Sequence, residues 1–197
     1  MTADAPSTRD RLIATMLQAM QRKGLHGVGL TELLAQAQAP KGVLYHHFPG
    51  GKTELAVAAI EAAAAHMGHR LAQLLERPEE LTTTIDQWMT QAQHQLARSD
   101  YELGCPMATV ALESTAEDTA VRTAIAQGFE TLRQQLGHAL AQRGLTRARA
   151  RMLATTMVAA YEGALIQARV AGSPDAMRDT TRGLVLLLQT ELAKTSA

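Results

Sequence analysis

The sequence TELLAQAQAPKGVLYHHFPGGK at residues 31–52 decides how this chain folds. Leu33 and Leu34 belong to one face of a short helix, and Thr31 is placed to cap its start. Pro40 suits the first position of a second helix, because its missing N–H is not needed there, and it disfavours helical geometry at the residue before it. The stretch therefore predicts two short helices with a tight turn between them.

The second of these helices is expected over about residues 40–47, where Leu44 faces inward with help from Phe48. The Pro-Gly-Gly sequence that follows stops it. Its outward residues combine a positive charge, a glycine, a small apolar side chain and polar rings, which suits a DNA groove better than catalysis. These residues are Lys41, Gly42, Val43, Tyr45 and His46.

In a DNA complex, the start of this helix (Lys41, Gly42, Val43) would approach the bases. Phosphates would be held by Thr31, Tyr45, His46 and Lys52. Lys52 also opens the next helix, whose free N–H groups and positive dipole end favour phosphate. These arguments alone leave a generic helical hairpin equally open, because such hairpins are common.

Residues 31–55 resemble the DNA-binding signature of the TetR family of bacterial transcriptional regulators. The run APKGVLYHHFPGGK is similar to the LmrA/YxaF-like branch, in which a doubled glycine before the lysine is usual. Gln38 departs from the pattern, since many relatives carry glycine at that turn. The resemblance implies an all-α protein with a three-helix, helix-turn-helix DNA-binding head, residues 1–52. The helical body, residues 53–197, would bind an effector and form the dimer.

Composition independently favours an all-helical protein, since aromatic residues make up only 3% of a chain that is 46% hydrophobic. No apolar run approaches the roughly 18–20 residues that span a bilayer. The N-terminus lacks the layout of a signal peptide, and the single cysteine fits a reducing compartment. We therefore expect a cytoplasmic protein.

The net charge of zero argues by itself against a nucleic-acid ligand, but its distribution does not. Residues 1–52 hold six Lys and Arg against three Asp and Glu, whereas residues 53–197 hold thirteen against sixteen. A basic head on an acidic body suits DNA contact confined to one end of the protein.

Apolar spacing and capping residues predict the remaining helices. They are a first helix that is capped by Ser7 and ends near Gly24, then helices at residues 52–76, 82–99, a short one to about Ser114, and 118–143, 147–171 and 174–193. The last two have apolar faces wider than a surface helix needs. The resemblance implies that they form a four-helix bundle with a second copy, although an ordinary buried pair is the alternative. The predicted interface consists of Met152, Ala160, Ala164, Leu184 and Leu188.

The body is rich in methionine, which suits an adaptable apolar pocket. Any one of these side chains is more often an ordinary core residue, but the resemblance implies that several line a cavity. The predicted lining is His66, Met67, Trp88, Met89, Gln91, Cys105, Met107, Phe129, Met157 and Tyr161.

Other chemistry finds little support in the sequence. His66 and His69 are spaced to share a metal, but no further ligand completes the set, so no metal or cofactor is predicted. No nucleophile and base stand at a recognisable spacing, so we predict that the protein is not an enzyme. Cys105 precedes Pro106 at a predicted helix start, where a thiol pKa can be lowered, which leaves a redox sensor open.

The sequence thus predicts a homodimeric, ligand-responsive transcriptional repressor that binds a near-palindromic double-stranded operator. The resemblance implies a lipophilic small-molecule effector and an efflux or detoxification gene as the target. Two alternatives stay open. One is a thiol-based regulator that works through Cys105, and the other is a helical small-molecule carrier whose head no longer binds DNA.

Overall fold

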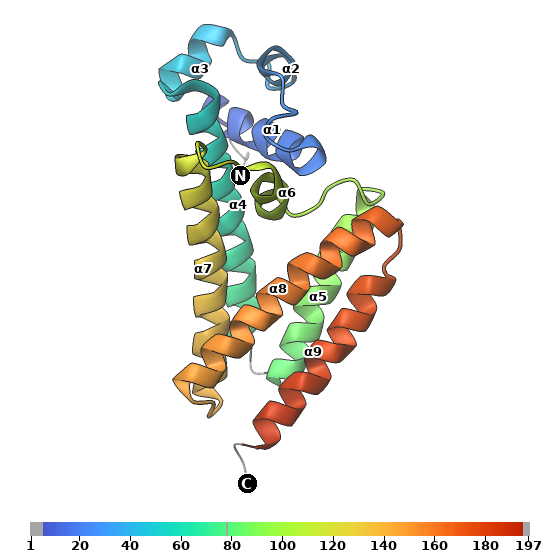
Figure 1. The fold of residues 1–197 in the computed structure, drawn as a ribbon. Coiled ribbons are helices and arrows are strands. Elements are labelled where there is room, and N and C mark those ends of the chain that lie inside the picture. The colour runs from blue at the N-terminus through green and yellow to red at the C-terminus, as the bar shows by residue number, and fades with distance from the viewer. Residues whose placement is uncertain (1–5, 78, 195–197) are drawn as a thin grey trace, which may run out of the picture. The chain divides into compact units, whose positions relative to one another are not determined.

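A computed structural model describes residues 6–77 and 79–194, and within these residues the chain forms helices and turns without any strand. The helices are α1 (Thr8–Lys23), α2 (Leu30–Gln36), α3 (Lys41–His47), α4 (Gly51–Leu75), α5 (Leu81–Arg98), α6 (Pro106–Glu113), α7 (Thr119–Gln142), α8 (Arg147–Ala171) and α9 (Asp175–Ala193) (Figure 1). Except for α2, each helix end predicted from the sequence lies within one residue of these bounds. The prediction of an all-α fold is confirmed.

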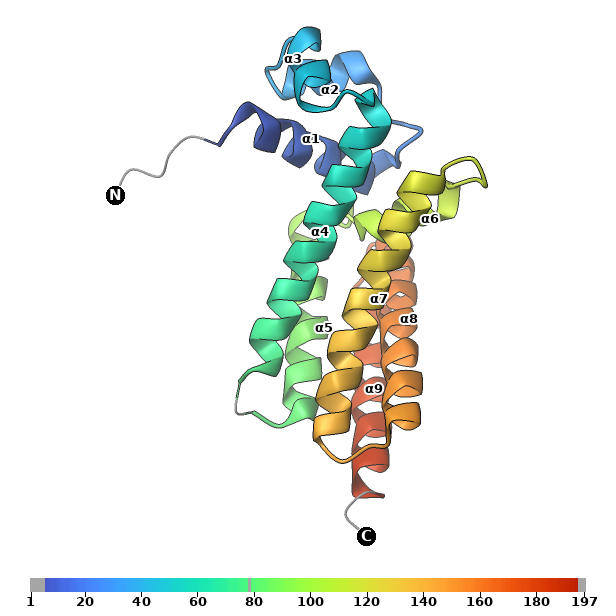
Figure 2. The ribbon, with the colours of Figure 1, turned by 90° about the vertical axis from the view of Figure 1, so that its left-hand side faces the viewer.

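The helices form two compact units, which Figures 1 and 2 show from two sides. The first unit contains α1, α2, α3 and α6, with α4 as far as Ala64 and α7 as far as Gly128. The second contains α5, α8 and α9 with the remainders of α4 and α7. This division differs from the predicted domains, 1–52 and 53–197, because α6 joins the first unit. The functional division at residue 52 stays a prediction.

The first unit is organised around α1, which packs against α2, α3 and α6. Ser7 caps this helix as predicted, because its hydroxyl accepts a hydrogen bond from the Asp10 N–H at 3.2 Å. The apolar face of α1 is fully buried at Leu12, Met16 and Met20. These side chains form the platform that supports the two short helices.

The second unit is built from α5, α8 and α9, which all contact one another. Thr146 caps the start of α8 by accepting from the Arg149 N–H at 3.4 Å. The side chain of Arg149 lies 3.1 Å from the carboxylate of Glu191, so the start of α8 is tied to the end of α9. Among the described residues, no helix is both long enough and apolar enough to cross a bilayer.

Candidate nucleic-acid interface

The two short helices of the first unit, α2 and α3, form the predicted helix-turn-helix. The N-cap of α2 is Gly29 and no side chain caps it, so the expectation that Thr31 caps this helix is wrong. Thr31 lies instead in the first turn and is exposed. Pro40 occupies the N-cap of α3, one position earlier than predicted. Leu44 and Phe48 are buried as expected, with exposed fractions of 0% and 1%.

The turn between α2 and α3 depends on an unusual backbone at Gln38, whose φ is +50°. Left-handed geometry is costly for a residue with a Cβ, which explains why glycine suits this position. Neighbouring contacts hold the turn in place. The Ala39 N–H donates to the Leu34 carbonyl at 3.0 Å, and the Arg11 guanidinium donates to the Ala37 carbonyl at 3.3 Å.

Replacing Gln38 with glycine should therefore stabilise the protein. Removing the Cβ from a residue with left-handed backbone stabilises the folded state by about 1–2 kcal/mol. The greater conformational freedom of glycine in the unfolded chain offsets about 0.4–1 kcal/mol of this. We expect a gain of about 0.5–1 kcal/mol in the free energy of unfolding, measured in urea. The matched control is Gln18→Gly in helical α1, which should cost about 1 kcal/mol. A loss at Gln38 would contradict the strain argument.

The outer surface of α3 presents the side chains predicted to meet DNA. Lys41 and His46 are exposed, Tyr45 is 46% exposed and Val43 is half-buried. Gly42 has open space around it, because nothing lies within 4 Å of the position that a Cβ would occupy. This surface therefore combines charge, polar rings and room for close backbone approach on one short helix.

The start of α4 lies beside this surface. Gly51 has a φ of +66°, and a Cβ on it would stand 3.2 Å from the Tyr45 ring, so the glycine lets that ring pack closely. Lys52 follows and is half-buried. Burial lowers the pKa of the Lys52 ammonium, and the negative charge of Glu113 raises it in part. Lys52 is thus a partly desolvated cation at the start of α4.

Two further features of the first unit were not anticipated from the sequence. The Glu54 carboxylate accepts from the N–H of Gly50, the residue before α4, at 2.6 Å. Glu54 lies in the first turn of α4, where a negative charge is favoured by the positive end of the helix dipole, so its role could have been recognised. Arg9 lies 5.4 Å from the centre of the Phe48 ring, a cation–π contact between α1 and the end of α3.

The loop after α6 adds a third unexpected contact. The Asp118 carboxylate accepts from the N–H and the hydroxyl of Thr115, at 2.8 and 2.9 Å. It also lies 3.9 Å from the imidazole of His26, in the turn after α1. The Thr115 hydrogen bonds lower the pKa of Asp118 most, and the charges of His26 and Arg122 contribute less. Residues 26 and 118 are too far apart in sequence for any local pattern to have linked them.

This environment predicts a pH dependence for Asp118→Asn. A lowered carboxyl pKa stabilises the fold above the ordinary value of 3.8, and the stabilisation is lost as pH falls through the lowered value. The variant should melt below the wild type at pH 7, and the difference should shrink as pH falls below 3.8. Melting curves across this range check the prediction, with the exposed Asp86→Asn as control. A difference that does not change with pH would contradict it.

The residues predicted to line a pocket are divided between the units. Cys105 and Met107 belong to the first unit, where Cys105 is the N-cap of α6. The others lie in the second unit and are His66, Met67, Trp88, Met89, Gln91, Phe129, Met157 and Tyr161. Among these, the rings of Trp88 and Tyr161 stack with centres 4.4 Å apart and planes 6° from parallel.

The predicted pocket residues of the second unit differ in their exposure to solvent. Trp88, Met89, Met157 and Tyr161 are buried, Met67 and Phe129 are half-buried, and His66 is exposed. Gln91 accepts from the Arg70 guanidinium at 2.8 Å, which engages one of the polar groups proposed for a ligand. Their role in a pocket stays a prediction.

The residues predicted for a dimer interface fall into two groups. Ala164, Leu184 and Leu188 are buried within the single chain, with exposed fractions of 1%, 5% and 0%. In the single chain these three side chains are therefore internal, and the dimer interface itself stays a prediction. Ala160 is half-buried and Met152 is 63% exposed. Sequence spacing identified the apolar helices but not which apolar side chains face the chain's own core.

The exposed apolar side chains of α8 and α9 mark a different set. Met152, Ile166 and Val170 lie on one face of α8, because multiples of the helical repeat separate them. Leu186 and Leu187 are exposed on α9. At Gly163 and Gly183 nothing lies within 4 Å of the position that a Cβ would occupy, so both helices leave room for close approach.

Comparison with known proteins relates both halves of the chain to regulators. Residues 12–59 match the family described as bacterial regulatory proteins, tetR family. Residues 82–182 match the family described as the C-terminal domain of the LmrA/YxaF-like transcriptional regulator. The chain is 25% identical over 159 residues to the HTH-type transcriptional regulator LmrA of Bacillus subtilis, covering 81% of this chain and 85% of that one.

Two other relatives extend this similarity. An HTH-type transcriptional regulator of Mycobacterium tuberculosis is 28% identical over 193 residues, which cover 95% of this chain and 97% of that protein. The crystal structure of the reduced form of NemR from Escherichia coli superposes with a TM-score of 0.79 at 27% identity. That match covers 90% of this chain and 96% of the NemR chain.

Proposed function

The chain belongs to the TetR family of bacterial transcriptional regulators, and on that premise we propose that it is a homodimeric repressor released from its operator by a lipophilic small molecule. The observation that carries the DNA-binding part is the outer surface of α3. Lys41, Gly42 and Val43 stand at the start of that helix and are available to base edges. Tyr45, His46 and Lys52 are available to phosphates, together with Thr31 of α2.

A second copy is needed to read a near-palindromic operator. The exposed apolar side chains of α8 and α9 support a two-fold interface, because five large apolar residues on two adjacent helices would otherwise face water. Each subunit would then insert α3 into a major groove, with half-sites about 34–36 Å apart or slightly more.

The experiment that tests the DNA-binding proposal is binding of the purified protein to fluorescent fragments of the DNA upstream of its own gene. The salt concentration is varied and an excess of nonspecific competitor is present. With about 6–10 phosphate contacts, affinity should fall by roughly a thousandfold or more between low and moderate salt. Genome-wide selection of bound fragments extends the search to distant operators. Absence of specific binding in both experiments would reject the proposal in favour of a carrier that does not bind DNA.

The effector is proposed to bind in the second unit near the stacked pair of Trp88 and Tyr161. Buried aromatic and methionine side chains suit a lipophilic or planar molecule. Similarity to the LmrA/YxaF-like regulators is what supports this effector class and an efflux or detoxification gene as the target. The genes beside the selected operator fragments test the second part directly.

Trp88 is the single tryptophan of the chain, so its fluorescence reports on this region alone. Titration with a lipophilic planar dye should change the Trp88 emission with saturation, and the same dye should release operator DNA over the same concentration range. Tyr161→Ala removes the stacked ring and should weaken both responses about tenfold, as expected for loss of an aromatic contact of about 0.5–1.5 kcal/mol plus its buried area. Tyr161→Phe retains the ring and should leave them almost unchanged. A dye that releases DNA without affecting Trp88 would place the effector elsewhere.

A thiol-based response through Cys105 is the second candidate. Its position as the N-cap of α6 supports it, whereas the burial of the side chain, 7% exposed, limits access by an oxidant. Oxidant should release DNA from the wild type and not from Cys105→Ser if this candidate is correct. An equal response of both proteins would eliminate it.

A further inference from the structure

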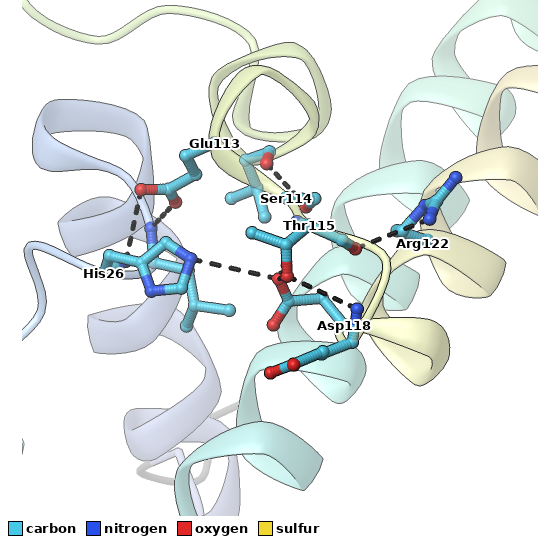
Figure 3. A network of polar contacts seen from close by, with 9 residues as sticks. His26, Glu113, Ser114, Thr115, Asp118 and Arg122 are labelled. Carbon is cyan, nitrogen blue, oxygen red and sulfur yellow. Dashed lines mark hydrogen bonds and ion pairs between the residues drawn. The ribbon is translucent and has the colours of Figure 1, made fainter.

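The turn that follows α1 is shaped to hold a negatively charged group. Gly24 has a φ of +70°, and the N–H groups of Leu25 and His26 after it point to a common acceptor. That acceptor is the carboxylate of Glu113, the last residue of α6 (Figure 3). One oxygen accepts from the Leu25 N–H and the other from the His26 N–H at 3.2 Å. Successive N–H groups that converge in this way form an anion-binding nest.

Gly24 is required for this arrangement on grounds of space as well as conformation. A Cβ at this position would stand 2.5 Å from one oxygen of Glu113 and 2.7 Å from its carboxyl carbon. The carboxylate therefore occupies the volume that any other residue would fill. The glycine and the acid, 89 positions apart (113 − 24), complete a single site within the first unit.

The loop after Glu113 is held by hydrogen bonds of its own. The Ser114 hydroxyl donates to the Val110 carbonyl at 2.7 Å, which closes the end of α6. The Thr115 carbonyl accepts from the Arg122 guanidinium at 3.5 Å, which joins the loop to α7. Asp118 binds Thr115 and approaches His26, so the loop meets the turn after α1 at a second point (Figure 3). Glu113, at the end of α6, is thus followed by a loop that is internally bonded and meets the turn after α1.

The same carboxylate acts on the predicted DNA surface. Its charge is close enough to Lys52 to raise the pKa of that ammonium against the effect of burial. The turn that it binds leads directly into α2, and α1 supports both α2 and α3. Occupation of the nest therefore fixes the segment that enters the helix-turn-helix and places a negative charge beside a candidate phosphate ligand.

We propose that Glu113 is a positioning residue for DNA binding, which acts as a latch between α6 and the head by filling a carboxylate-binding nest at Gly24–His26. The proposal rests on the proposed function as a DNA-binding regulator. When Glu113 occupies the nest, the turn after α1 is ordered and residues 1–52 are positioned for the operator. When Glu113 leaves the nest, the turn becomes more mobile and the affinity for the operator falls. A free carboxylate of small size is the class of ligand that the emptied nest would take.

The first test does not depend on DNA. Amide hydrogen exchange is measured at Leu25 and His26 in the full chain, for the wild type and for Glu113→Ala. Exchange at both amides should be at least tenfold faster in the variant, because each loses a hydrogen bond to a charged acceptor. Acetate should slow it again, and chloride at equal ionic strength should not. Glu117→Ala, which removes the same charge from the loop that follows α6, is the matched control and should leave both amides unchanged.

The second test measures operator affinity at constant ionic strength. Glu113→Ala should lose about tenfold in specific affinity, as for one charge-assisted hydrogen bond, and acetate should restore it. Glu113→Gln keeps the size of the side chain and one acceptor, so its loss of operator affinity should be smaller. This variant also keeps the test possible if the alanine variant does not fold. Nonspecific affinity should not fall in either variant, since both remove a negative charge near Lys52.

The outcomes separate the latch from the proposed function. Unchanged exchange at Leu25 and His26 in Glu113→Ala would overturn the latch, whatever the protein does with DNA. Faster exchange with unchanged operator affinity would overturn its role in positioning. A wild type that binds no operator would reject the proposed function, and with it the positioning role, while the exchange data would still report whether the nest holds a carboxylate.

Discussion

Operator affinity should fall by about a hundredfold when Lys52 is replaced by alanine, because the dimer would lose two charge-assisted contacts to phosphate, each worth about 1.5 kcal/mol or more. The slope of log affinity against log salt should become shallower by about 1.8, since each contact contributes about 0.9. Lys52 is half-buried, so its ammonium is already partly fixed and gives up less freedom on binding than a fully exposed lysine would. Titration of a labelled operator at several salt concentrations gives both quantities.

The loss at Lys52 should be the same for the operator and for operators with altered base pairs, because a phosphate contact carries no sequence information. Adding Tyr45→Phe removes only a hydroxyl, so the further loss should be smaller and equally independent of sequence. Lys194→Ala is the control for a lost positive charge, since Lys194 pairs with Glu191 in the second unit. An unchanged salt slope in Lys52→Ala would remove this residue from the interface.

The helices were predictable because their ends carry local signals. Ser7, Pro40 and Thr146 mark helix starts, and Gly24 and Gly172 mark helix ends, each through backbone or capping preferences that act over a few residues. The outer surface of α3 was also predictable, since burial of Leu44 fixes which side chains of a seven-residue helix face outward. The backbone at Gln38 was predictable for a similar reason. Many relatives carry glycine at this turn, and the residue has a positive φ here.

Contacts between distant segments could not be predicted in this way. Nothing in the spacing of Gly24 and Glu113 indicates that one makes room for the other, because the match exists only after α6 packs on α1. The apolar faces of α8 and α9 pose a similar problem. Both faces are wide enough to contribute to the core and to an interface at once, so the sequence does not show which residue does which. The structure shows that Ala164 and Leu188 are internal and that Val170 is exposed.

Introducing charge on this exposed face should separate the proposed dimer. Val170 is 85% exposed and Leu186 is 64% exposed, so Glu at both positions is tolerated by the single chain but would face apolar side chains of a second copy. The double variant should sediment as a monomer at concentrations where the wild type is a dimer. Its operator affinity should fall at least a hundredfold. In the dimer, binding of one head holds the second head near its half-site, a gain of about 10²–10⁴ that separate monomers lose.

Two comparisons make the dimer result specific. Gln73→Glu with Ala97→Glu adds the same charge at exposed positions of α4 and α5 and should leave both mass and affinity unchanged. Ala164→Leu alters the internal face of α8, so it should lower the free energy of unfolding by about 1–3 kcal/mol through overpacking. If the Val170 and Leu186 variant stays dimeric while folded, the two-fold contact must use another surface. If the variant is monomeric and still binds the operator as tightly as the wild type, operator recognition does not need the dimer.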